Sequence, residues 1–167
     1  MCTATAIVFL ACFWPMMYWS RWATISRGVG TFWMSIARGG LVLAASLAYA
    51  LGVKSCFVLN IEYYTGVGRR LDAPVVLPPL LDLEEASGAR VLIADDVADT
   101  GHTLDLVRSL CVDKVAEARI AVLYEKPTST ISCEYVWRPT DRWIEFPWSS
   151  EPPLVASEEF AAWPRRR

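Results

Sequence analysis

The stretch VLIADDVADTGHT, residues 91–103, decides the fold of this chain of 167 residues. Its apolar start predicts a buried strand over Val91–Ala94, which gives way to two adjacent carboxylates, Asp95 and Asp96. Burial of carboxylates is costly unless a ligand or a partner group uses them. The loop that follows offers backbone N–H groups, hydroxyls and the start of a helix, which together form an anion site. The stretch therefore predicts a strand end that binds a ligand with a sugar diol and a phosphate group.

The sequence on both sides of this stretch alternates between strand and helix patterns. Further strands are predicted at Ser35–Ala37, Cys56–Ile61, Arg119–Tyr124 and Glu134–Trp137, and helices at Leu41–Leu51 and from Thr103 to about Asp113. This alternation predicts an α/β fold with a mostly parallel central sheet and helices on both faces. Residues 62–82 are expected to form a long loop or a small hairpin, the hood of the fold, and loops of this length often close over ligands.

Residues 34–150 are predicted to form one domain between two atypical ends. Residues 1–33 begin with an almost wholly apolar run, which Pro15 interrupts and which carries no charge before Arg21. Three explanations are open for this run: a segment packed against the domain, a membrane anchor, or a misassigned start or shifted reading frame. Residues 151–167 are expected to form a C-terminal tail.

Charge and cysteine content exclude two kinds of site. The 16 basic and 18 acidic residues leave no basic surface for nucleic acid. Five cysteines without a Cys-x-x-Cys pair, together with a single histidine, do not make a structural zinc site. Free thiols are expected in a reducing compartment, so the cytoplasm is the predicted location.

The candidate phosphate loop ends the quoted stretch. Gly101 lets the backbone approach an anion, and Thr100 and Thr103 add hydroxyl donors. Asp99 would repel a phosphate, so its carboxylate is expected to face a second ligand, a reacting base, where it can take up or share a proton. His102 is expected to be an exposed residue of the same loop.

A second candidate anion site precedes the first helix. Gly39 and Gly40 stand between a strand and a helix, where their backbone N–H groups are free to bind a pyrophosphate, and Arg38 adds positive charge. A pair of glycines alone is common in turns. Together with the phosphate loop, this turn predicts a ligand with two anionic groups.

A candidate base site lies near the C-terminus. A flat base needs a stacking partner and a donor for its exocyclic oxygen. Trp143 can stack on a ring, and Lys126, just past a predicted strand, can donate to a 6-oxo group. The alternative is a core tryptophan and a solvent-exposed lysine, which the residue types alone favour.

Together the three motifs resemble those of the type I phosphoribosyltransferases, and in particular of the xanthine–guanine and related 6-oxopurine enzymes. The resemblance spans about residues 35–150 and rests on residues 37–42, 91–103, 125–127 and 143–148. It implies transfer of the phosphoribosyl group from 5-phosphoribosyl 1-pyrophosphate (PRPP) to xanthine, guanine or hypoxanthine. It further implies that the products are pyrophosphate and the nucleoside 5′-monophosphate, that Mg²⁺ is the cofactor, and that the protein is a homodimer or homotetramer.

The resemblance also implies a role for each motif. For PRPP, the implied pyrophosphate site is Arg38, Gly39 and Gly40, the site for the ribose diol and Mg²⁺ is Asp95 and Asp96, and the 5′-phosphate site is Thr100, Gly101, His102 and Thr103. Arg69 is a further implied PRPP-binding residue. For the base, Asp99 is implied to act at the purine N7, Lys126 to contact O6, Trp143 to stack on the ring and Ile144 to offer backbone contacts. Two departures from the family pattern stand out. Leu43 occupies a position where the family commonly has proline, and residues 1–33 show neither the expected amphipathic helix nor the strand that leads into Arg38.

Two other functions are compatible with parts of the sequence. A non-catalytic PRPP-binding regulatory protein would keep the same fold, although Lys126 and Trp143 argue against it. A membrane-associated protein is favoured only by residues 1–19 and the apolar run Leu41–Val53, both too short for a confident membrane span.

Overall fold

The computed structural model describes residues 31–64, 70–77 and 83–150. These belong to two compact units, one that includes the residues up to Asp141 and one that begins at Arg142. The atypical N-terminal run, the C-terminal tail and Arg69 lie outside the described residues. Among the helices of the described ranges, none is long and apolar enough to span a membrane.

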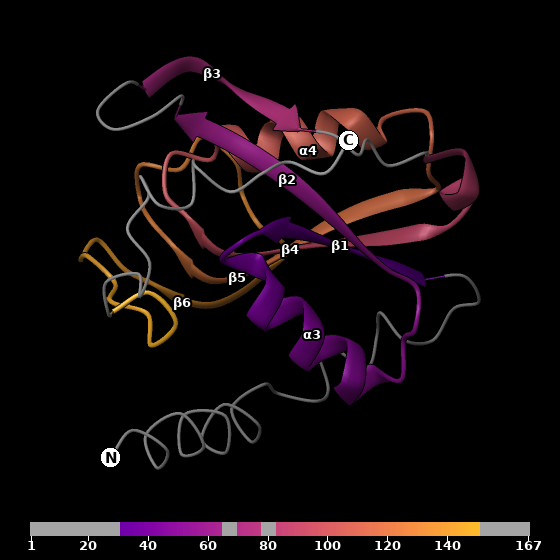
Figure 1. The fold of residues 1–167 in the computed structure, drawn as a ribbon, viewed down its shortest axis with the longest axis horizontal. Coiled ribbons are helices and arrows are strands. Elements are labelled where there is room, and N and C mark those ends of the chain that lie inside the picture. Colours follow the sequence, from indigo (N-terminus) through magenta and orange to yellow (C-terminus); the bar gives the residue numbers. More distant parts are fainter. Residues whose placement is uncertain (1–30, 65–69, 78–82, 151–167) are drawn as a thin grey trace, which may run out of the picture. The chain divides into compact units, whose positions relative to one another are not determined.

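A six-stranded sheet forms the centre of the unit that ends at Asp141 (Figure 1). Its strands lie in the order β3-β2-β1-β4-β5-β6. Five of them run parallel, and β3 pairs with β2 in the antiparallel direction. The elements in chain order are β1 Thr31–Ala37, α3 Gly40–Leu51, β2 Cys56–Tyr64, β3 Arg70–Leu77, the 3₁₀ helix η1 Leu83–Ala86, β4 Arg90–Ala98, α4 His102–Cys111, β5 Glu117–Glu125 and β6 Tyr135–Pro139.

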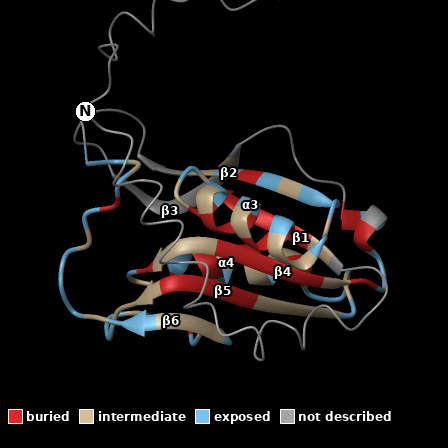
Figure 2. Ribbon diagram, turned by 90° about the horizontal axis from the view of Figure 1, so that it is seen from below, coloured by how far each residue is buried: buried red, intermediate tan, exposed pale blue. Residues whose placement is uncertain are grey.

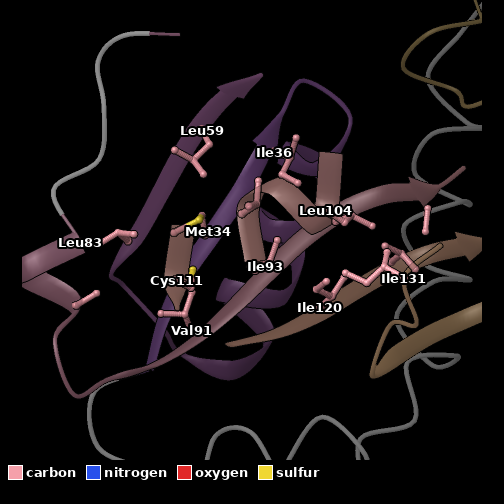
Figure 3. Packing of buried hydrophobic residues seen from close by; sticks show 14 residues of the cluster. Met34, Ile36, Leu59, Leu83, Val91, Ile93, Leu104, Cys111, Ile120 and Ile131 are labelled. Atoms are coloured by element: carbon pink, nitrogen blue, oxygen red, sulfur yellow. The ribbon is translucent and has the colours of Figure 1, made fainter. Parts of the chain in front are cut away.

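The predicted α/β fold with a mostly parallel sheet is confirmed. Helices α3 and α4 cover opposite faces of this sheet. The buried cluster that includes α4 takes alternate residues of β1, β4 and β5, whereas α3 packs on β1 and β4 and its buried residues lie outside this cluster. Met34, Ile93 and Ile120 lie in one buried cluster with Leu104 of α4 (Figure 3). The two central strands, β1 and β4, are deeply buried, as is the middle of the neighbouring β5 (Figure 2). This burial explains the continuous apolar run at the start of β4.

Two elements differ from or refine the prediction. Strand β4 does not end at Ala94 but continues to Ala98, because β5 goes on pairing with it as far as Glu125. The prediction that Asp95 and Asp96 terminate the strand is therefore wrong, and both acids lie inside its last half. Residues 62–82 contain the end of β2 and all of β3, so the hairpin alternative is confirmed.

Candidate active site

Three candidate loops follow three neighbouring parallel strands. The turn with Arg38 follows β1, the loop from Asp99 follows β4, and Lys126 follows β5. The carboxyl ends of parallel strands meet at one edge of a sheet, which is where ligands bind in such folds. The structure thus brings the predicted pyrophosphate, ribose phosphate and O6 residues of this unit to one edge.

The turn after β1 lies directly against the two acids of β4. A Cβ added to Gly39 would overlap the Asp96 carboxylate, 2.6 Å from its Oδ1 atom. A Cβ added to Gly40 would lie 2.9 Å from the Cα atom of Asp95. Gly39 has a φ of −58°, which any residue can adopt, so the close approach alone requires glycine there. The peptide bond between Ala37 and Arg38 is cis.

The carboxyl of Asp95 sits in a network of backbone donors. The N–H of Asp96 donates to its Oδ1 atom at 2.9 Å. Burial raises the pKa of Asp95 well above its usual range and the neighbouring Asp96 carboxylate raises it further, while hydrogen bonds from the backbone N–H groups of Asp96 and Gly40 oppose the rise. These effects together make the Asp95 carboxyl harder to ionise than an exposed aspartate.

The loop after β4 needs glycine at its centre. Gly101 has a φ of 86°, and a Cβ there would lie 2.8 Å from Cγ2 of Ile131 and 2.9 Å from Oγ of Ser129. Helix α4 then begins at His102, whose side chain is exposed as predicted. The first turn of a helix leaves backbone N–H groups without helical partners, so this loop can bind an anion.

Asp99 and Lys126 form an ion pair. The Nζ atom of Lys126 lies 3.1 Å from Oδ1 of Asp99, and the lysine side chain is only 15% exposed. The alternative of a solvent-exposed lysine is therefore wrong. A carboxylate whose side chain is 57% exposed, next to a largely buried lysine, offers a proton acceptor and a donor side by side. Such a pair suits the adjacent N7 and O6 atoms of a 6-oxopurine.

Comparison with known proteins identifies the family of the chain that forms this site. Residues 31–153 match the family described as phosphoribosyl transferase domain. The chain belongs to this family. The resemblance seen in the sequence motifs is confirmed.

Individual phosphoribosyltransferases are similar over most of their length. The chain is 34% identical over 145 residues to the xanthine-guanine phosphoribosyltransferase of Gluconobacter oxydans, covering 81% of this chain and 82% of the relative. It is 34% identical over 132 residues to the enzyme of the same name from Nitratidesulfovibrio vulgaris, covering 78% of this chain and 76% of the relative. The crystal structure of the purine phosphoribosyltransferase from Pyrococcus horikoshii superimposes with a TM-score of 0.67 at 29% identity, covering 86% of this chain and 95% of that chain.

The aromatic loop of this phosphoribosyltransferase belongs to the second unit, which begins at Arg142. Trp143 is 86% exposed, so the alternative of a core tryptophan is wrong, and Ile144 is half-buried. Phe146 and Trp148 stack with ring centroids 4.8 Å apart. That Trp143 stacks on a base, with Ile144 at its edge, stays a prediction.

Sequence reasoning missed one part of the site, the segment after Lys126. The hydroxyl of Thr128 donates to the carbonyl oxygen of Asp99 at 2.9 Å. The hydroxyl and the N–H of Thr130 both donate to the carbonyl oxygen of Thr100 at 3.0 Å. The run Thr128-Ser129-Thr130 was the available signal, because hydroxyls beside a predicted phosphate loop are candidate hydrogen-bond donors.

The raised pKa of Asp95 predicts a stability that depends on pH. The pKa of an aspartate in the unfolded chain is about 3.9. Between this value and the raised pKa, the folded protein holds a proton on Asp95 that the unfolded chain has released. The contribution of Asp95 to stability is therefore complete below about pH 3.9 and falls as the pH rises through the raised pKa. Asp95→Asn removes this loss. We expect the variant, without ligands, to have a higher Tm at pH 7–8 by a few degrees, since about 1 kcal/mol shifts Tm by roughly 2–4 °C at this size.

Thermal unfolding of both proteins between pH 4 and 8 checks this result. The advantage of Asp95→Asn is expected to vanish toward pH 4, and superimposable profiles over the whole range would contradict it. Saturating PRPP with Mg²⁺ should stabilise the wild-type protein more than the variant.

Proposed function

We propose that this phosphoribosyltransferase transfers the phosphoribosyl group from PRPP to a 6-oxopurine: xanthine, guanine or hypoxanthine. The pairing of Lys126 with Asp99 at 3.1 Å, next to two anion loops, carries this proposal. The products are the nucleoside 5′-monophosphate and pyrophosphate. The names of the relatives, xanthine-guanine phosphoribosyltransferases, support the same substrate class.

The PRPP groups are assigned to the two loops. The turn Arg38–Gly40 binds the pyrophosphate, and the loop Thr100–Thr103 binds the 5′-phosphate through its backbone N–H groups and hydroxyls. Asp95 and Asp96 accept hydrogen bonds from the ribose diol. The closeness of Gly39 to Asp96 supports this arrangement, because it puts the pyrophosphate loop beside the residues for the sugar.

The same acids suit Mg²⁺. Within the described ranges no cluster of three or more His, Cys, Asp or Glu side chains could hold a metal. Mg²⁺, however, usually binds through one or two carboxylates together with substrate phosphates, and Asp95 and Asp96 provide such a pair. Asp95 and Asp96 would hold Mg²⁺, which would supply positive charge to neutralise the departing pyrophosphate.

The reaction forms a bond from a ring nitrogen of the purine to C1′ of the ribose and breaks the bond from C1′ to pyrophosphate. Lys126 donates to O6 and orients the base, and Asp99 shares the proton at N7 as the new bond forms. Trp143 stacks on the ring, and Ile144 contacts its edge through the backbone. Alignment of the two substrates supplies much of the rate acceleration, because it replaces a bimolecular encounter.

A substrate panel tests the proposal. Hypoxanthine, xanthine, guanine and adenine are each supplied with PRPP and Mg²⁺, and formation of the nucleotide is measured. We expect turnover with the 6-oxopurines and little with adenine, because Lys126 cannot donate to an amino group. No turnover by a folded protein, or a preference for adenine, would overturn it. PRPP binding without purine binding would instead indicate the regulatory alternative.

A further inference from the structure

The segment Lys126–Ile131 closes on the phosphate loop along its whole length. The N–H of Lys126 donates to the carbonyl oxygen of Ala98 at 2.9 Å, ahead of the bonds from Thr128 and Thr130 to the next two carbonyls. Three consecutive carbonyls of the chain, those of residues 98, 99 and 100, thus point toward this segment. These hydrogen bonds use the backbone carbonyls of Asp99 and Thr100 and not their side chains; the Asp99 carboxylate pairs with Lys126.

These carbonyl directions fix the N–H directions. In a trans peptide the C=O of one residue and the N–H of the next point in opposite directions, and the peptide bonds of this loop are trans. The N–H groups of Thr100 and Gly101 therefore point away from Lys126–Ile131. Neither of them donates to another backbone group among the described residues. Two parallel N–H groups next to a helix N-terminus make a concave anion site.

We propose that Thr128 and Thr130 are positioning residues that set the geometry of the 5′-phosphate site. By holding the carbonyls of Asp99 and Thr100, their hydroxyls aim the N–H groups of Thr100 and Gly101 at the phosphate. This inference rests on the proposed function, since it assigns a second task to the segment that carries Lys126. It also ties the phosphate loop and the purine O6 site to one piece of chain.

Valine variants test the proposal, because valine keeps the branched shape and removes the hydroxyl. Thr128 and Thr130 are both exposed, so their replacement leaves the core intact. We expect Thr128→Val and Thr130→Val each to raise the KM for PRPP about 3- to 10-fold, since water and the Thr130 N–H replace part of the lost bond. In the double variant, the KM for PRPP should rise about 10- to 50-fold. The KM for the purine should change by less than about 2-fold.

Two controls separate positioning from a general structural effect. Thr130→Ser keeps the hydroxyl and should behave as the wild type. Ser132→Ala removes an exposed hydroxyl of the same region whose side chain makes no hydrogen bond among the described residues, and it should change neither KM. Calorimetric affinity for ribose 5-phosphate should fall in the double variant, whereas affinity for pyrophosphate should not.

The outcomes distinguish this inference from the proposed function. A KM for PRPP within about 2-fold of wild type in the double variant, or an equal rise for the purine, overturns the positioning role alone. If the wild-type protein binds PRPP without turnover, the proposed function fails, and the affinities for ribose 5-phosphate still decide the inference. If it binds neither PRPP nor ribose 5-phosphate, both are overturned.

Discussion

Gly39→Ala is expected to lower kcat/KM for PRPP about 100-fold or more without loss of stability. The new Cβ would occupy the place of the Asp96 carboxylate. The carboxylate is the far end of a side chain that can rotate, so it is displaced and the backbone stays in place. Alanine also fits the backbone, because φ is −58° at this position. Steady-state kinetics and thermal unfolding check the two halves of this expectation.

A glycine elsewhere in the fold provides the matched control. Gly88 has a φ of 71° and no atom within 4 Å of an added Cβ. Gly88→Ala should therefore cost stability through backbone strain and leave activity unchanged, the reverse of the result at Gly39. Asp96→Asn should reproduce the kinetic defect of Gly39→Ala, and the double variant should lose little more, since both act on the same carboxylate. Additive losses would contradict the explanation.

Asp99→Asn is expected to lower kcat about 100- to 1,000-fold, which is typical for loss of a group that moves a proton. Asparagine keeps the shape of aspartate and can still accept a hydrogen bond from Lys126 Nζ, which lies 3.1 Å from Oδ1 of Asp99. It cannot take up the purine proton. The KM for PRPP should stay within about 2-fold, because in the proposed site the carboxylate faces the base and not the phosphate.

Asp105→Asn is the matched control for this variant. Asp105 is an exposed carboxylate in the first turn of α4, so its removal changes the local charge by the same amount. We expect kcat to be unchanged there. A kcat for Asp99→Asn within about 3-fold of wild type would show that Asp99 does not act on the proton. A large rise in the KM for PRPP would place its carboxylate at the phosphate.

Local patterns in the sequence predicted the main features of the sheet and of the site. The apolar run before Asp95 predicted a buried strand, and the two glycines after Arg38 predicted a turn at its neighbour. Both patterns depend on residues close together in the chain, where periodicity and turn chemistry are strong. The placement of Lys126 after β5 followed from the same rules.

Two features depended on contacts that the sequence does not show. Strand β4 continues past Asp95 because backbone pairing with β5, for example Val97 with Tyr124, outweighs the cost of acids in a strand. The bonds from Thr128 to Asp99 and from Thr130 to Thr100 join residues 29 and 30 positions apart. A local pattern carries no information about such pairs.

The order of β1, β4 and β5 in the sheet has a consequence for how this enzyme can change its specificity. Neighbouring strands lie about 4.8 Å apart, so the separation between the three loops is a property of the backbone ladder. In the proposed site, the sheet therefore fixes the spacing between the loops assigned to the pyrophosphate, the sugar and the base. Substitutions in one loop can therefore alter which chemical group that loop binds, while the spacing to the other two loops is preserved.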